Sequence, residues 1–195
     1  MRLSSKIISV CIALFVLTTF TGESFSNDKE MTAEEYKKEV VVIQGLLKEA
    51  PENPKLHNTL GFYLYKIGEY DDAKKEYADA IKYDNTFPVP YNNLGIIALI
   101  ENDYEAAESY FSDAIDLNPK YAKAVYNLGV TYFRQKRYMK AVEYYLKAKD
   151  VDEDYVKERE DMEKGDAELR EALKKDPDNK VLKYLLEKSN EKKNN

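Results

Sequence analysis

The 195-residue sequence has very few of the side chains that most often carry catalysis or hold transition metals. It contains one histidine (His57), one cysteine (Cys11) and no tryptophan. Ser–His–Asp and Cys–His sites need a histidine beside the nucleophile, and structural zinc sites need several cysteines and histidines at short spacing. Neither pattern occurs, nor does a glycine-rich phosphate-binding motif. The sequence therefore predicts no enzyme, no catalytic residues, no metal and no cofactor, and it predicts a packing or surface role for His57.

A dense positive face is also absent. The chain has 30 Lys and Arg residues against 36 Asp and Glu residues, a net charge of −6, and the two signs alternate along the sequence. Nucleic-acid binding needs Lys and Arg gathered on one face to neutralise phosphates, so we expect no nucleic-acid partner. The acidic stretch 150–154 lacks the glycine and the spacing of a calcium loop. Acidic residues at helix starts, such as Asp71 and Asp72, favour the positive end of a helix.

Residues 1–26 have the composition of a signal peptide. Arg2 and Lys6 precede an apolar run over 7–20, and Ser24 and Ser26 supply small residues for cleavage after Ser26. The run is shorter than the roughly 20 residues that span a bilayer, and no other run of that length follows. We therefore expect export, to the periplasm or cell envelope if the source is bacterial, with an uncleaved anchor as the alternative. The mature chain would have no membrane span and no cysteine, which suits an oxidising compartment.

A 34-residue period organises the rest of the chain. Gly61, Gly95 and Gly129 are 34 residues apart, and each of them follows a leucine. The same step relates further columns of small and aromatic residues, namely Tyr70, Tyr104 and Tyr138; Ala73, Ala107 and Ala141; Tyr77, Phe111 and Tyr145; and Ala80, Ala114 and Ala148. Apolar residues recur at helical spacing within each unit, so each unit is predicted to hold two amphipathic helices.

These columns closely resemble the tetratricopeptide repeat, a helix–turn–helix of 34 residues, over Pro54 to Tyr155. The resemblance implies an all-α fold, a right-handed α-solenoid of stacked helix–turn–helix hairpins with helical caps. The glycines and alanines would let paired helices approach, and the aromatic column would fill the space between layers. The expected divisions are a signal peptide, 1–26; a half-repeat or capping helix opened by a capping box at Thr32, 27–53; three repeats, 54–87, 88–121 and 122–155; a degenerate repeat with capping helices, 156–188; and a disordered tail, 189–195.

In tetratricopeptide arrays the first helices line a concave groove that binds peptides. By alignment, the groove here would be apolar and aromatic with positive charge at both ends, which suits a peptide with hydrophobic anchors and an acidic group. Packing between repeats is the alternative for Phe62, Ile96 and Val130. The predicted groove comprises Lys55, Asn58, Phe62, Tyr65 and Lys66; Asn92, Ile96, Leu99 and Ile100; and Lys123, Tyr126, Val130, Phe133 and Arg134.

A carboxylate clamp, which some members of the family build from Lys, Arg and Asn on these helices, is only partly matched. Asn93 and Asn127 recur in one column, but Thr59 interrupts that column. The leading hypothesis is thus an exported protein–protein interaction module, an adaptor or envelope assembly factor that holds a peptide or protein segment. A self-assembling scaffold, suggested by the charged stretch 156–175, is the alternative, and a small-ligand receptor is a minor one.

Overall fold

The computed structural model describes residues 31–157 and the single residues 174, 177 and 183. Every regular element in this part of the chain is a helix, and the helices follow one another in hairpins. The predicted all-α fold of helix–turn–helix repeats is thereby confirmed. The predicted signal peptide and tail, and nearly all of the predicted degenerate repeat, lie outside the described residues.

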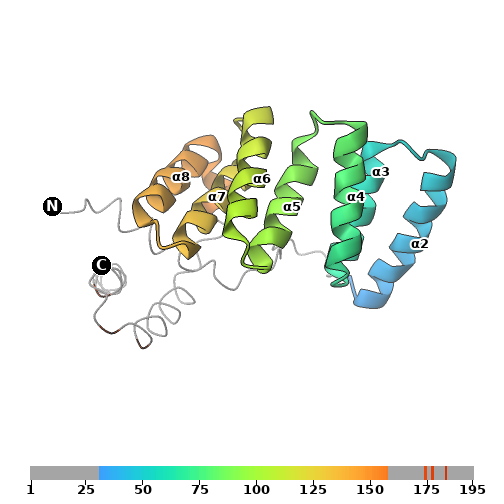
Figure 1. The fold of residues 1–195 in the computed structure, drawn as a ribbon, viewed down its shortest axis with the longest axis horizontal. Coiled ribbons are helices and arrows are strands. Elements are labelled where there is room, and N and C mark those ends of the chain that lie inside the picture. The colour runs from blue at the N-terminus through green and yellow to red at the C-terminus, as the bar shows by residue number, and fades with distance from the viewer. Residues whose placement is uncertain (1–30, 158–173, 175–176, 178–182, 184–195) are drawn as a thin grey trace. The chain divides into compact units, whose positions relative to one another are not determined.

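The chain divides at Ala124 into two compact units, which are described separately. We call Ser26–Ala124 the N-terminal unit and the part from Val125 onward the C-terminal unit. In the N-terminal unit each helix packs on the next in chain order (Figure 1): α2 (Ala33–Glu49), α3 (Pro54–Lys66), α4 (Tyr70–Tyr83), α5 (Pro88–Ile100) and α6 (Tyr104–Leu117). Helix α7 (Ala122–Arg134) begins at the boundary, and the C-terminal unit continues with α8 (Tyr138–Val151) and α9 (Glu153–Lys157).

Side-chain caps fix where several helices begin. The predicted capping box is present at α2, where Thr32 Oγ1 accepts from the Glu35 amide at 3.3 Å and Glu35 Oε2 accepts from the Thr32 amide at 2.6 Å. These bonds from Thr32 lower the pKa of Glu35. The side chains of Asn53 and Asp103 cap α3 and α6 by accepting from backbone amides in the first turn, without the reciprocal bond. Each cap satisfies amide groups that a helix start leaves without partners.

The turn inside each hairpin contains one residue in the left-handed conformation. These residues are Gly68 (φ 84°), Asn102 (φ 61°) and Lys136 (φ 61°), and they recur at the 34-residue period. Glycine and asparagine adopt this conformation readily, whereas a lysine adopts it at a cost of roughly 1–2 kcal/mol. The turn geometry is thus kept in the third hairpin although its residue no longer favours it.

Close contact between the paired helices of the first two hairpins depends on Gly61 and Gly95, because glycine has no Cβ. A Cβ at Gly61 would lie 2.7 Å from the Tyr77 ring, and a Cβ at Gly95 would lie 2.6 Å from the Phe111 ring. Both rings are buried, with exposed fractions of 1% and 0%. The interpretation that glycine lets α3 approach α4, and α5 approach α6, is therefore confirmed at both positions.

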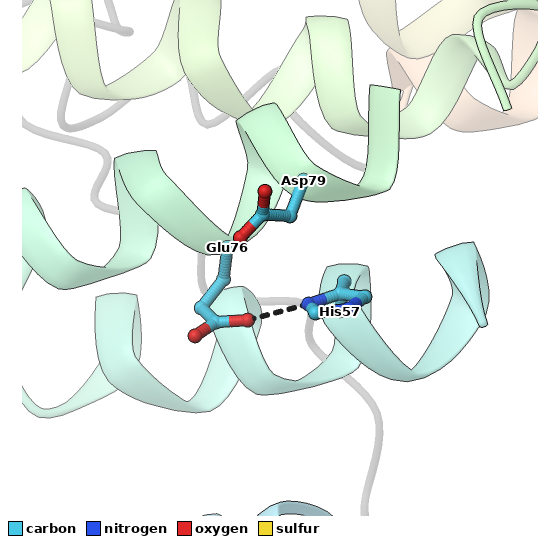
Figure 2. Close-up of side chains that lie close together, drawn as sticks. All are labelled: His57, Glu76 and Asp79. Carbon is cyan, nitrogen blue, oxygen red and sulfur yellow. Dashed lines mark hydrogen bonds and ion pairs between the residues drawn. The ribbon is translucent and has the colours of Figure 1, made fainter. Parts of the chain in front are cut away.

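His57 provides a polar link within the first hairpin. Its Nδ1 lies 2.7 Å from Oε2 of Glu76 on α4, a contact drawn as a dashed line in Figure 2. Its Nε2 lies 2.9 Å from the carbonyl oxygen of Pro51. The ring also stacks on Tyr83, with 5.2 Å between ring centroids. Burial lowers the pKa of His57, but the hydrogen bonds to Pro51 and Glu76 outweigh burial and raise the pKa above its usual value. The protonated imidazolium can donate to both acceptors at once.

We expect Gly95→Ala to lower the free energy of unfolding by roughly 1–2 kcal/mol, because the added methyl group overpacks the contact with the Phe111 ring. Gly45→Ala is the matched control: a Cβ at Gly45, inside α2, meets nothing within 4 Å. That control should gain about 0.5–1 kcal/mol from helix propensity alone. Urea denaturation followed by circular dichroism measures both variants. Equal stabilities for the two would contradict the packing argument.

The His57 link should make stability depend on pH. A pKa that is higher in the folded state gives stabilisation that is complete below the unfolded value of about 6.5 and disappears as pH rises through the folded value. In buffer containing EDTA, the free energy of unfolding of the wild type should therefore fall as the pH rises above about 6.5. His57→Gln should flatten this slope. Identical slopes for both proteins would show that the pair contributes nothing.

Candidate functional site

The first helices of two successive repeats, α3 and α5, lie beside each other in the N-terminal unit. The Asn93 side-chain amide donates to Oδ1 of Asn58 at 3.1 Å, which joins α5 to α3 directly. Asn92 in turn donates to Oδ1 of Asn93 at 3.4 Å, and Asn92 is only 3% exposed. Of these asparagines, Asn58 and Asn92 belong to the predicted groove. The link between Asn58 and Asn93 was not predicted, although their offset of 35 residues is close to the repeat period.

An aromatic surface with a cation beside it covers the part of α3 that faces α2. Phe62 is 39% exposed and contacts the Tyr63 ring, with 5.7 Å between centroids. The Lys66 ammonium group lies 6.0 Å from the Phe62 ring and 5.8 Å from the ring of Tyr36 on α2. Such cation–ring contacts hold a lysine near an apolar surface. Phe62 and Lys66 were predicted to line the groove, whereas Tyr36 was not, because α2 was interpreted only as a cap.

Two further predicted groove residues on α3 differ in exposure. Lys55, in the first turn, is exposed to solvent, and Tyr65, near the end of the helix, is half-buried. Burial, followed by the neighbouring Tyr70, raises the pKa of Tyr65 to about 12. The Tyr65 hydroxyl therefore stays protonated near neutral pH and can donate a hydrogen bond.

Helix α5 carries partly open aliphatic side chains. Ile96, Leu99 and Ile100 are all half-buried, while Ile97 and Ala98 between them are buried in the core. A helix that is apolar on nearly all sides buries one face and leaves another partly open. We use the name α3–α5 face for the residues of these two helices that were predicted to line the groove and that are exposed or half-buried, namely Lys55, Asn58, Phe62, Tyr65, Lys66, Ile96, Leu99 and Ile100.

The predicted groove residues on α7 are divided between surface and interior. Lys123 is exposed and Arg134 is half-buried. Tyr126, Val130 and Phe133 are buried, with exposed fractions of 2%, 3% and 6%. Inside the C-terminal unit, Tyr126 packs edge-on against Tyr155 at 5.7 Å, and Phe133 packs against Tyr138 at 5.5 Å.

One group of side chains offers ligands of the kind that metals take. His57, Glu76 and Asp79 each present one ligand atom, and these atoms lie within 4.8 Å of one another. Figure 2 shows Glu76 and Asp79 on one helix and His57 on the helix facing it. Sequence spacing did not reveal this group, since the two carboxylates follow His57 by 19 and 22 residues and lie on a different helix.

Among the described residues, no helix combines the length and the apolar composition needed to cross a membrane.

Several solved structures share this fold. The structure of MamA is 22% identical in sequence, with a TM-score of 0.61, and the match covers 89% of this chain and 97% of MamA. A thermophilic TPR protein of Thermus thermophilus is 19% identical with a TM-score of 0.59, covering 80% of this chain and 91% of that one. YrrB, described as a TPR protein with an unusual peptide-binding site, is 28% identical with a TM-score of 0.55, covering 62% of each chain. No curated protein matches the sequence.

The family profile agrees with the period found in the sequence. The profile described as tetratricopeptide repeat matches residues 58–120 and again residues 92–155, which together make up just over half of the chain. The two matches overlap because each of them spans more than one 34-residue unit. The chain belongs to the tetratricopeptide repeat family.

Proposed function

We propose that this protein is an exported interaction module that binds a peptide or protein segment on the α3–α5 face. The observation that carries the proposal is Phe62, an aromatic side chain left 39% exposed with the Lys66 ammonium group beside its ring. An exposed aromatic ring beside a cation can serve as an anchor for a partner, because aromatic residues dominate the binding energy of many protein interfaces. The peptide-binding site described for YrrB adds support.

The chemistry of the face indicates the kind of partner. Half-buried Ile96, Leu99 and Ile100 supply an apolar surface that would receive hydrophobic side chains of a bound segment. Lys55 and Lys66 supply positive charge along α3. An acidic group next to hydrophobic anchors would be attracted by that charge, which favours correct orientation and fast association. The expected ligand is therefore a peptide with aliphatic or aromatic anchors and at least one carboxylate.

The predicted groove residues on α7 enter the proposal differently. Tyr126, Val130 and Phe133 are buried, so their substitution would test packing before it tested binding. Lys123 is exposed and could add a further positive charge for an acidic partner. A test of binding that leaves the core intact should accordingly use the α3–α5 face.

Self-association is a second candidate, and helix α2 provides the observation for it. Val41, Val42 and Leu46 are exposed by 68%, 53% and 48%, so the outer side of this helix carries three large apolar side chains. A second copy of the chain that covered them would remove apolar area from water, which favours association. Within this scaffold function the exposed side of α2, rather than the α3–α5 face, would be the contact surface.

Phe62→Glu should weaken peptide binding about tenfold or more, because it removes the aromatic anchor and repels a carboxylate. The peptide to use is one selected from a random displayed library against the wild-type protein, with its dissociation constant measured by fluorescence anisotropy. Leu117→Glu is the matched control, since Leu117 is also 39% exposed but lies on the second helix α6. It should change the dissociation constant less than about twofold.

Unchanged helical circular dichroism in both variants would show that the fold is intact. Equal affinity of the folded Phe62→Glu and Leu117→Glu proteins would refute binding on the α3–α5 face. A library that yields no binding peptide, together with a molar mass by light scattering that rises with protein concentration, would favour self-association.

Export rests on the composition of residues 1–26 and has its own test. After expression of the full sequence in a bacterial host, the protein should be recovered from the periplasmic fraction with Asn27 as its first residue, because cleavage is expected after Ser26. N-terminal sequencing and intact mass measurement distinguish this product from the uncleaved chain. Recovery from the membrane fraction with residues 1–26 retained would favour the anchor, and recovery from the cytoplasm would exclude export.

A further inference from the structure

We propose that His57, Glu76 and Asp79 form a binding site for one divalent transition-metal ion of the zinc type. Each residue contributes one ligand atom, and these atoms lie within 4.8 Å of one another. The site lies inside the first hairpin, with the imidazole on α3 and both carboxylates on α4 (Figure 2). The proposal is independent of peptide binding, since none of the three residues belongs to the α3–α5 face.

The helix pair holds the three ligands at a fixed spacing. Glu76 and Asp79 are three residues apart on α4, so their side chains lie on the same side of that helix. The backbone that carries them is anchored by Ala73, Tyr77 and Ala80, whose exposed fractions are 0%, 1% and 0%. A site built on packed helices requires only side-chain rotations to bring its ligands together.

The imidazole is oriented with its Nδ1 atom toward the Glu76 carboxylate. The Nε2 atom lies 2.9 Å from the Pro51 carbonyl oxygen, an arrangement in which Nε2 keeps its proton and donates it. When Nε2 carries the proton of a neutral imidazole, the lone pair lies on Nδ1. Metal-binding histidines commonly donate their second ring N–H to a backbone carbonyl in this manner. Stacking on the Tyr83 ring, at 5.2 Å, further restricts rotation of the imidazole.

The charges in the group favour a cation with two positive charges. The Asp79 side chain makes no hydrogen bond or ion pair within the described part of the chain, although the residue is half-buried. Protonated His57 can pair with Glu76, at 2.7 Å, but its single positive charge balances only one of the two carboxylates. The nearby Lys82 ammonium group lies over the Tyr83 ring, 5.1 Å from its centroid. A divalent ion would replace the Nδ1 proton and balance both carboxylates.

The donor set selects the class of metal. An imidazole nitrogen with two carboxylate oxygens suits Zn²⁺ and similar transition ions, whereas Mg²⁺ and Ca²⁺ prefer oxygen ligands alone. Zinc binds such ligands at about 2.0–2.2 Å, and tetrahedral ligands then lie about 3.5 Å apart. Rotation of the two half-buried carboxylate side chains would bring the three ligand atoms, now within 4.8 Å of one another, to that shorter distance. Three protein ligands would leave one coordination position for water or a partner's side chain.

The test is a titration of the protein with Zn²⁺ by isothermal titration calorimetry near pH 7.5, and a titration with Mg²⁺ serves as the comparison. The protein carries no affinity tag, and it is treated with a chelator that is then removed before the titration. One Zn²⁺ should bind per chain, and Mg²⁺ should not bind. Asp79→Asn and His57→Gln should each weaken zinc binding roughly tenfold or more, since even partners outside the ligand set change metal affinity by that factor. Asp79→Asn is the decisive variant, because the Asp79 side chain makes no hydrogen bond or ion pair within the described residues, so its substitution should leave the fold intact.

Asp72→Asn serves as the control: it makes the same chemical change on the same helix, at an exposed carboxylate that pairs with Lys75. It should bind zinc like the wild type. Absence of zinc binding in the wild type would overturn the proposal. Equal zinc affinity in the wild type, Asp79→Asn and Asp72→Asn would also overturn it, since the zinc would then be held by other carboxylates.

Discussion

The packing of the first two hairpins depends on Gly61 and Gly95, two glycines that have no side chain at the contact between paired helices. At Gly61 and Gly95 the first helix of a hairpin rests directly against an aromatic ring of the second, and a methyl group would lie within 2.7 Å of that ring. This contact sets the distance between paired helices. The same distance brings His57 of α3 within hydrogen-bonding reach of Glu76 on α4. The α3–α5 face and the proposed metal site thus share one packing constraint, although they involve different residues.

The sequence predicted the all-helical fold of helix–turn–helix hairpins, and the capping box expected at Thr32 opens α2. Such features are readable because period, glycine spacing and caps are local properties. The left-handed Lys136 was not predictable from residue type, since lysine rarely adopts that conformation; only its position 34 residues after Asn102 carries a signal.

The candidate site was harder to predict from the sequence than the fold was, for a physical reason. Alignment to a repeat tells which face of a helix a residue occupies, but its exposure depends on every neighbour that packs there. Phe62 and Val130 are two periods apart on the same column, yet Phe62 is 39% exposed and Val130 is 3% exposed. The group around His57 joins residues outside the repeated columns. Tyr36 lies one period before Tyr70, but its contact with the Lys66 ammonium group comes from a different helix and is not visible in the spacing. Contacts of that kind arise from tertiary geometry rather than from spacing.

The glycine–ring contact has a consequence for how the chain acquires its structure. Gly61 meets Tyr77, and Gly95 meets Phe111, each across only 16 residues of sequence. Contacts so short in sequence cost little loop-closure entropy, and each hairpin can form before the next has been delivered. A chain that emerges one end first, from a ribosome or through a membrane pore, can therefore fold in the order in which it arrives. Each completed hairpin then offers the next a finished surface on which to pack.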